Sequence, residues 1–125
     1  MKTTHWLRLE GAVIFFIFIA FIIGNFGFSW WLVLLFFAPD ISFIGYALGT
    51  RAGAWIYNLA HSYVLPMILL AMSYFCANMI DFSIVGGNYI SLLWIAHIGF
   101  DRMLGYGLKE TTGFSDTHLG RIGRL

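Results

Sequence analysis

The chain has 125 residues, of which 60% are hydrophobic and only 10% are charged. Soluble domains carry about 25% charged residues, so this composition excludes an ordinary water-soluble domain and is typical of a membrane protein. The formal net charge of +1 provides no basic face of useful size, which argues against nucleic acid as a partner. The single cysteine excludes an internal disulfide bond.

Four long apolar segments predict an all-α fold. We expect a four-helix bundle that crosses the membrane several times. We expect its spans at about residues 9–26, 29–49, 52–77 and 88–108, all within one integral-membrane domain that covers residues 1–125. Lys2 and Arg8 precede the first apolar run as in a secretory signal, but no small-residue cleavage site follows, so we expect this helix to be retained.

The second span depends on the placement of Asp40. The apolar run before Pro39 is too short to cross a bilayer, which needs about 20 residues, so Asp40 is expected inside the membrane or at the end of a re-entrant half-helix. Further along, Gly45, Gly49 and Gly53 are four residues apart, a spacing that suits close helix packing.

The third span contains a proline within its apolar run. Pro66 cannot donate a backbone hydrogen bond, and its ring crowds the carbonyl of Ser62, so we expect a kink beside His61. After the fourth span the chain turns polar. We expect a cytoplasmic tail, residues 109–125, with a short C-terminal interfacial helix that Ser115 or Asp116 caps.

Basic residues predict the orientation in the membrane. With four spans, one side carries all the lysines and arginines and the other carries only Asp81. The positive-inside rule therefore predicts that the N- and C-termini are both cytoplasmic. The basic residues are Lys2, Arg8, Arg51, Arg102, Lys109, Arg121 and Arg124.

Ionisable residues within the apolar segments mark the candidate site. His97 and Asp101 are four residues apart, so on a helix they share one face; Asn58 and His61, three apart, also face one way. An aspartate at a bilayer centre costs roughly 2.5–3.5 kcal/mol, which makes such residues functional candidates by default. In the predicted topology they fall in one leaflet, so we expect one polar site that opens to the cytoplasm.

Six short motifs are distributed over most of the chain. They are Arg8-Leu9-Glu10-Gly11, Ala38-Pro39-Asp40, Tyr57-Asn58-Leu59-Ala60-His61, His97-Ile98-Gly99-Phe100-Asp101-Arg102, Gly105-Tyr106-Gly107-Leu108-Lys109 and Asp116-Thr117-His118-Leu119-Gly120. Together they resemble a family of small bacterial membrane proteins, domain of unknown function 4260, over about residues 8–124. The resemblance implies a multi-pass protein of the bacterial inner membrane, and it carries over no activity, cofactor or catalytic residue.

One hypothesis is a metal-dependent, hydrolase-like membrane enzyme. A divalent metal such as zinc, iron or manganese would be bound by histidine and aspartate, and its bound water would attack a lipid or amphiphilic substrate. No HExxH or paired CxxC motif is present to support it. The predicted ligands are His61, His97, Asp101 and His118. Asp40 or Glu10 is the predicted base or further ligand, and the predicted substrate-binding residues are Asn58, Arg102 and Lys109, the last two for an anionic headgroup.

Two other hypotheses remain open at this point. Asp40, His61, His97 and Asp101 are the residue types of a proton- or ion-coupled transporter or relay, and four spans would then need a homo-oligomer to form a conduit. Alternatively, the polar groups only hold helices together through hydrogen bonds, each worth about 0.6 kcal/mol on average.

Overall fold

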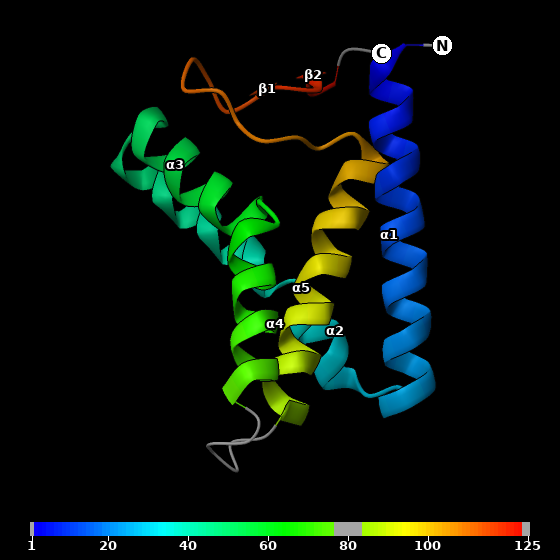
Figure 1. Ribbon diagram of the computed structural model, residues 1–125. Coiled ribbons are helices and arrows are strands. Elements are labelled where there is room, and N and C mark those ends of the chain that lie inside the picture. The colour runs from blue at the N-terminus through cyan, green and yellow to red at the C-terminus, as the bar shows by residue number, and fades with distance from the viewer. Residues whose placement is uncertain (1, 77–83, 124–125) are drawn as a thin grey trace.

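The computed structural model describes residues 2–76 and 84–123 and is nearly all-α, as the sequence predicts. Figure 1 shows the helices, which are α1 (Thr3–Phe26), α2 (Trp30–Phe36), the 3₁₀ helix η1 (Ala38–Leu48), α3 (Thr50–His61), α4 (Val64–Cys76) and α5 (Ile84–Leu104). A small hairpin of β1 (Asp116–Thr117) and β2 (Gly120–Arg121) follows. Asp81 and Arg124, both used in the orientation argument, lie outside the described residues.

Three helical segments are long and apolar enough to cross a membrane: Thr3–Phe26, Trp30–Leu48 and Thr50–Phe75. Only 11% to 17% of the residues in these segments are buried inside the protein. Because most of their apolar side chains face outward, the segments suit a lipid environment rather than water. The prediction of membrane helices is therefore confirmed. Helix α5 packs against α1, α2 and α4 and contains much of the buried core.

The second predicted span is interrupted. Helix α2 ends at Phe36, and the next eleven residues form η1 with Pro39 in its first turn. Pro39 cannot donate the hydrogen bond that a continuous α-helix requires at this point. In a 3₁₀ helix residues three apart lie above one another, which puts Asp40, Phe43 and Tyr46 in one row. The rings of Phe43 and Tyr46 contact Tyr57 and Phe114, so this row faces the protein interior.

The third predicted span is also broken rather than kinked. Helix α3 ends at His61, Ser62 is extended with φ −97° and ψ 152°, and α4 begins at Val64. Pro66 falls in the first turn of α4, where a backbone N–H has no partner within the helix in any case. The proline therefore starts a second helix at no hydrogen-bond cost, and α3 leaves the direction of α4 (Figure 1).

Glycines allow the closest helix contacts. A Cβ on Gly11 of α1 would lie 2.5 Å from the Cβ of Arg102 and 2.7 Å from the carbonyl oxygen of Gly99. Only glycine permits α1 and α5 to approach this closely. Of the three glycines predicted to pack, Gly45 and Gly53 do so against Ile56 and Tyr46, whereas Gly49 forms the turn before α3 with φ +107°.

The C-terminal segment differs from the prediction. In place of an interfacial helix, Asp116 and Thr117 pair with Arg121 and Gly120 in an antiparallel hairpin. Gly120 has a φ of +112°, which no right-handed helix contains. Asp116 does not cap a helix, because its side chain accepts a hydrogen bond from Thr112 at 2.9 Å. Helix α5 likewise stops at Leu104, before the predicted residue 108, because Gly105 has a φ of +93°.

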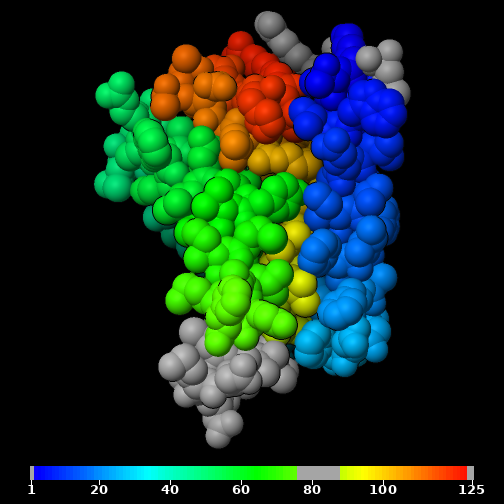
Figure 2. Space-filling model, in the orientation of Figure 1, coloured from blue at the N-terminus to red at the C-terminus, as the bar shows by residue number. Residues whose placement is uncertain are grey.

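The start of α1 and the hairpin lie at the same end of the molecule, as the blue and red surfaces in Figure 2 show. The number of membrane crossings and the cytoplasmic location of the two termini stay predictions.

Replacing Gly11 by alanine tests the α1–α5 contact. We expect Gly11→Ala to lower the free energy of unfolding by about 1–3 kcal/mol, because the added methyl group has no space. Gly24→Ala in the same helix is the matched control: nothing lies within 4 Å of a Cβ there, and alanine favours a helix by up to about 1 kcal/mol. Thermal unfolding in detergent, followed by circular dichroism, measures both. Equal melting temperatures would show that the contact is unimportant.

Candidate metal centre

Four ionisable side chains from three helices converge at one point. Asp40 lies in the first turn of η1, His61 is the last residue of α3, and His97 and Asp101 are one turn apart on α5. Each offers one nitrogen or oxygen atom, and these atoms all lie within 4.8 Å of one another. We refer to Asp40, His61, His97 and Asp101 as the His/Asp cluster.

The separations within the cluster are short and nearly uniform. His61 Nε2 lies 3.3 Å from both Asp40 Oδ1 and His97 Nε2, and 3.5 Å from Asp101 Oδ2. His97 Nε2 lies 3.5 Å from Asp40 Oδ1 and 3.9 Å from Asp101 Oδ2. The four atoms therefore surround one small volume.

Burial leaves the cluster open on one side only. The side chains of His61 and His97 are 1% exposed and that of Asp101 is 13% exposed. The side chain of Asp40 is 35% exposed. Any molecule that reaches the cluster from outside therefore meets Asp40 first.

Contacts around His61 fix its orientation. Its Nδ1 lies 3.1 Å from the carbonyl oxygen of Tyr57, which can only accept a hydrogen bond, so Nδ1 carries the proton and donates it. The lone pair of Nε2 then points into the cluster, the arrangement found in metal-binding histidines. The Tyr57 ring stacks on the His61 ring at 3.8 Å, and the Tyr57 hydroxyl donates to Asp101 Oδ2 at 3.2 Å.

The cluster gathers electron-rich atoms and needs a positive charge to balance them. Two carboxylates and two imidazole nitrogens face one another, and facing lone pairs repel unless a proton or a metal ion lies between them. The guanidinium of Arg102 is engaged elsewhere: it donates to the carbonyl oxygens of His61 and Tyr106, both at 3.0 Å. Chemically, the arrangement is able to bind a cation or to share protons.

Two of the predicted metal-site residues lie elsewhere. His118 belongs to the C-terminal segment, and its Nδ1 accepts a hydrogen bond from the Leu108 amide at 2.8 Å. Burial and the charge of Arg102 lower the pKa of His118, which favours its neutral form. Glu10 is an exposed residue of α1. Neither is brought into the group of four, because the hairpin and α1 carry them away from η1 and α3.

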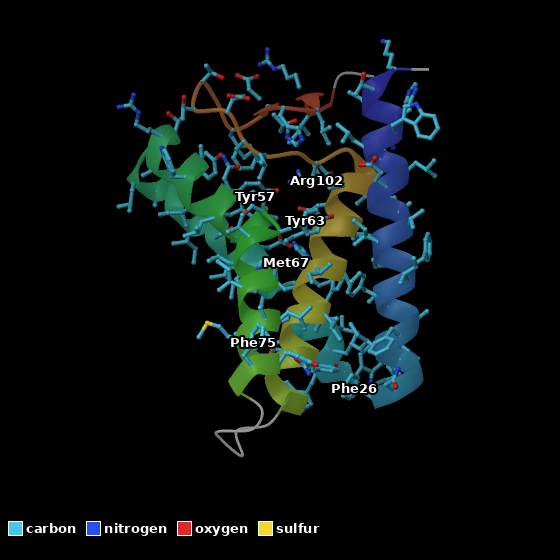
Figure 3. The ribbon with its side chains drawn as sticks, in the orientation of Figure 1. Phe26, Tyr57, Tyr63, Met67, Phe75 and Arg102 are labelled. Carbon is cyan, nitrogen blue, oxygen red and sulfur yellow. The ribbon has the colours of Figure 1, made fainter. Side chains whose placement is uncertain are left out.

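The predicted substrate-binding residues all make contacts within the protein. The amide of Asn58 pairs with the backbone of Lys109, donating to its oxygen at 2.9 Å and accepting from its N–H at 2.7 Å. Lys109 is 5% exposed, and its ammonium group donates to Phe114 O and lies 4.2 Å from the centre of the Phe114 ring. Burial lowers the pKa of Lys109, and the negative charge of Asp101 opposes this shift. Figure 3 shows Arg102 and Tyr57 near each other between α5 and α3. In the structure these groups bind other parts of the protein and so position the site; a role in substrate binding stays a prediction.

The sequence interpretation missed Tyr57 and Trp94 as parts of the site. Trp94 Nε1 donates to the carbonyl oxygen of Ala60 at 2.6 Å and so ties the end of α3 to α5. Tyr57 precedes His61 by four residues, so the helical spacing that paired His97 with Asp101 would also have found it.

An apolar cavity of about 340 Å³ adjoins the cluster; it is lined by Leu35, Ala38, Pro39, Ser42, Ala60, Ile90, Leu93 and Trp94.

Removal of the Asn58 amide is expected to release the C-terminal segment from α3. Asn58→Ala leaves the Lys109 amide and carbonyl without partners, at a cost of about 1–3 kcal/mol for each unsatisfied buried group. We expect faster trypsin cleavage after Lys109 and Arg121 in the purified protein. Asn25→Ala is the control, because the Asn25 side chain donates to Phe21 O within its own helix, far from the C-terminal segment in sequence. Equal cleavage rates for the two variants would contradict this role.

The comparisons with known proteins identify a family without assigning a function. No curated protein and no solved structure matches the chain. The family model described as domain of unknown function DUF4260 matches residues 4–122. Nearly the whole chain is covered, including all four residues of the His/Asp cluster. The protein therefore belongs to the DUF4260 family.

Proposed function

We propose that this protein is a metal-dependent membrane hydrolase whose metal centre is the His/Asp cluster. The spacing of the donor atoms carries the proposal. A tetrahedral zinc ion with bonds of about 2.0–2.1 Å holds its ligand atoms about 3.3 Å apart. The donor atoms of His61, His97 and Asp101 are 3.3, 3.5 and 3.9 Å apart, which is close to that requirement.

The ligand types limit the choice of metal. Two imidazole nitrogens and two carboxylate oxygens suit zinc, and with added water molecules they also suit iron or manganese. No thiolate belongs to the cluster, whose four members are two histidines and two aspartates. The tautomer of His61 and the hydrogen bond from Tyr57 to Asp101 supply the outer contacts that orient metal ligands.

Catalysis requires an open coordination position, because four protein ligands would close a tetrahedral site. His61, His97 and Asp101, the more buried residues of the cluster, would hold the ion and leave its fourth position to water. Bound there, the metal would supply a nucleophilic hydroxide for ester hydrolysis. Asp40, on the exposed side, would accept the proton and return it to the departing alcohol.

The apolar cavity beside the cluster favours an amphiphilic substrate. Its lining residues Pro39 and Ser42 flank Asp40, and Ala60 directly precedes His61. A hydrocarbon chain in this cavity would present a polar ester group to the metal. We accordingly propose a lipid or lipid-like ester as the substrate, reached from a bacterial inner membrane in which the N- and C-termini face the cytoplasm.

Metal content tests the centre itself. We expect near-stoichiometric zinc, iron or manganese in protein purified in mild detergent, measured by elemental mass spectrometry. The double variant His61→Ala/His97→Ala should lose the metal, because both imidazole ligands are gone. The control His118→Ala should retain it, since His118 lies outside the cluster. Wild-type protein that stays metal-free after incubation with all three metals would refute the proposal.

Asp40→Asn separates catalysis from metal binding. We expect this variant to keep most of its metal through the other three ligands and to hydrolyse acyl and phosphate esters about a hundredfold more slowly or worse, because an amide cannot accept the proton. Asp116→Asn is the matched control, since Asp116 lies in the hairpin. Fluorogenic esters in mixed micelles provide the assay. Unchanged hydrolysis in Asp40→Asn would exclude Asp40 as the base.

A proton pathway is the competing function, because the same contiguous groups can pass protons. It predicts a metal-free protein whose pH-dependent flux in proteoliposomes is abolished by Asp40→Asn. Observation of that flux without bound metal would replace the hydrolase proposal.

A further inference from the structure

A second cavity lies at the end of the molecule that carries the start of α1 and the hairpin. It has a volume of about 470 Å³ and is bounded by the first residues of α1, the end of α5 and the β-hairpin. We name it the basic cleft, because Lys2, Arg8 and Arg121 are among its lining residues and no aspartate or glutamate is. None of the residues of the His/Asp cluster lines it.

The cationic side chains of the cleft are available to a ligand. Arg8 is anchored through Nε, which donates to Met103 O at 3.0 Å, and the hydrogen bonds within the described chain do not engage its two terminal amino groups. Arg121 has only a long contact with Asp116, 3.8 Å between Nε and Oδ1, and its side chain is 59% exposed. Lys2 is also exposed. Among the described residues, the long contact of Arg121 with Asp116 is the one ion pair of these three positive charges, which together line the cleft.

The first turn of α1 adds to the positive potential of the basic cleft. Lys2 is the N-cap residue, it makes no side-chain capping hydrogen bond, and the first turn contains no acidic residue. The exposed amide groups and the positive end of the helix dipole therefore remain uncompensated beside Lys2 and Arg8. Both features favour an anion with several acceptor oxygens.

The position of the cleft suits a ligand at the membrane surface. Helix α1 is a candidate membrane span that begins at the cleft, and Trp6, one turn into it, is 55% exposed, as in the aromatic belts of membrane interfaces. We propose that the basic cleft binds a phosphate group at this surface, carried by an anionic lipid headgroup or by free phosphate. Arginine is suited to this role because its amino groups contact two phosphate oxygens together.

Ligand-induced stabilisation tests the proposal. The protein in neutral detergent micelles is titrated with short-chain phosphatidic acid, with phosphatidylcholine of the same chains, and with inorganic phosphate, and its melting temperature is recorded. We expect phosphatidic acid or inorganic phosphate to stabilise the protein and phosphatidylcholine to have no effect. A response to phosphatidic acid alone identifies a lipid headgroup as the ligand, whereas an equal response to inorganic phosphate identifies the free anion.

Variants show whether the basic cleft is responsible. Lys2→Gln/Arg121→Gln removes two exposed charges, of which Arg121 makes only the long contact with Asp116 among the described residues, and the apparent affinity should fall about tenfold or more. Arg8→Gln should have a comparable effect. The control Arg51→Gln removes an exposed charge at the start of α3, outside the cleft, and should bind as the wild type does.

Two outcomes would overturn the proposal: equal stabilisation by all three ligands, or unchanged binding in the double variant. The proposal is independent of the metal centre, because metal content is measured separately and should be the same in every one of these variants.

Discussion

Buried polar atoms in a membrane protein must find partners on neighbouring helices, because lipid offers none. The break after α3 leaves carbonyl groups of its last turn without helical partners, and α5 supplies the donors. Arg102 donates to the carbonyl of His61, and Trp94 donates to that of Ala60. These two hydrogen bonds hold the end of α3 against α5. They also bring the His61 ring to His97, so the contacts that satisfy the broken helix assemble the cluster.

The C-terminal segment completes the same region from another direction. Lys109 is buried under aromatic rings, with Phe114 and Tyr57 at 4.2 and 5.3 Å from its ammonium group. Asn58 binds the backbone of Lys109 and so attaches this segment to α3. The C-terminal segment is thereby tied to a position of α3 one turn from His61. Asp40, whose side chain is 35% exposed, is the most accessible member of the cluster.

The sequence was sufficient to predict the helical membrane fold and the pairing of His97 with Asp101, since both follow from hydropathy and helical spacing. It also placed Asp40 and His61 among the candidates from their depth in the membrane. It allowed a helix end near Asp40 but predicted neither the 3₁₀ form of η1 nor the break after His61, because Pro39 and Pro66 are compatible with a kink, a 3₁₀ segment or a new helix. The burial of Lys109 was missed because a lysine in a polar tail is ordinarily exposed. His118 was assigned to the site because nothing in the sequence indicates that residues 116–121 form a hairpin.

The 3₁₀ form of η1 affects how the protein fits its bilayer. A 3₁₀ helix rises about 2.0 Å per residue against about 1.5 Å in an α-helix. The eleven residues of η1 therefore extend about 22 Å instead of about 16 Å. The 19 residues of Trp30–Leu48 would extend about 28 Å as a continuous α-helix and extend about 34 Å with η1 in its 3₁₀ form, compared with about 30 Å for a hydrocarbon core. A return to α-helix would shorten the segment and turn Asp40 relative to Phe43 and Tyr46. A change in bilayer thickness that converted η1 to an α-helix would therefore also change the direction of the Asp40 carboxylate.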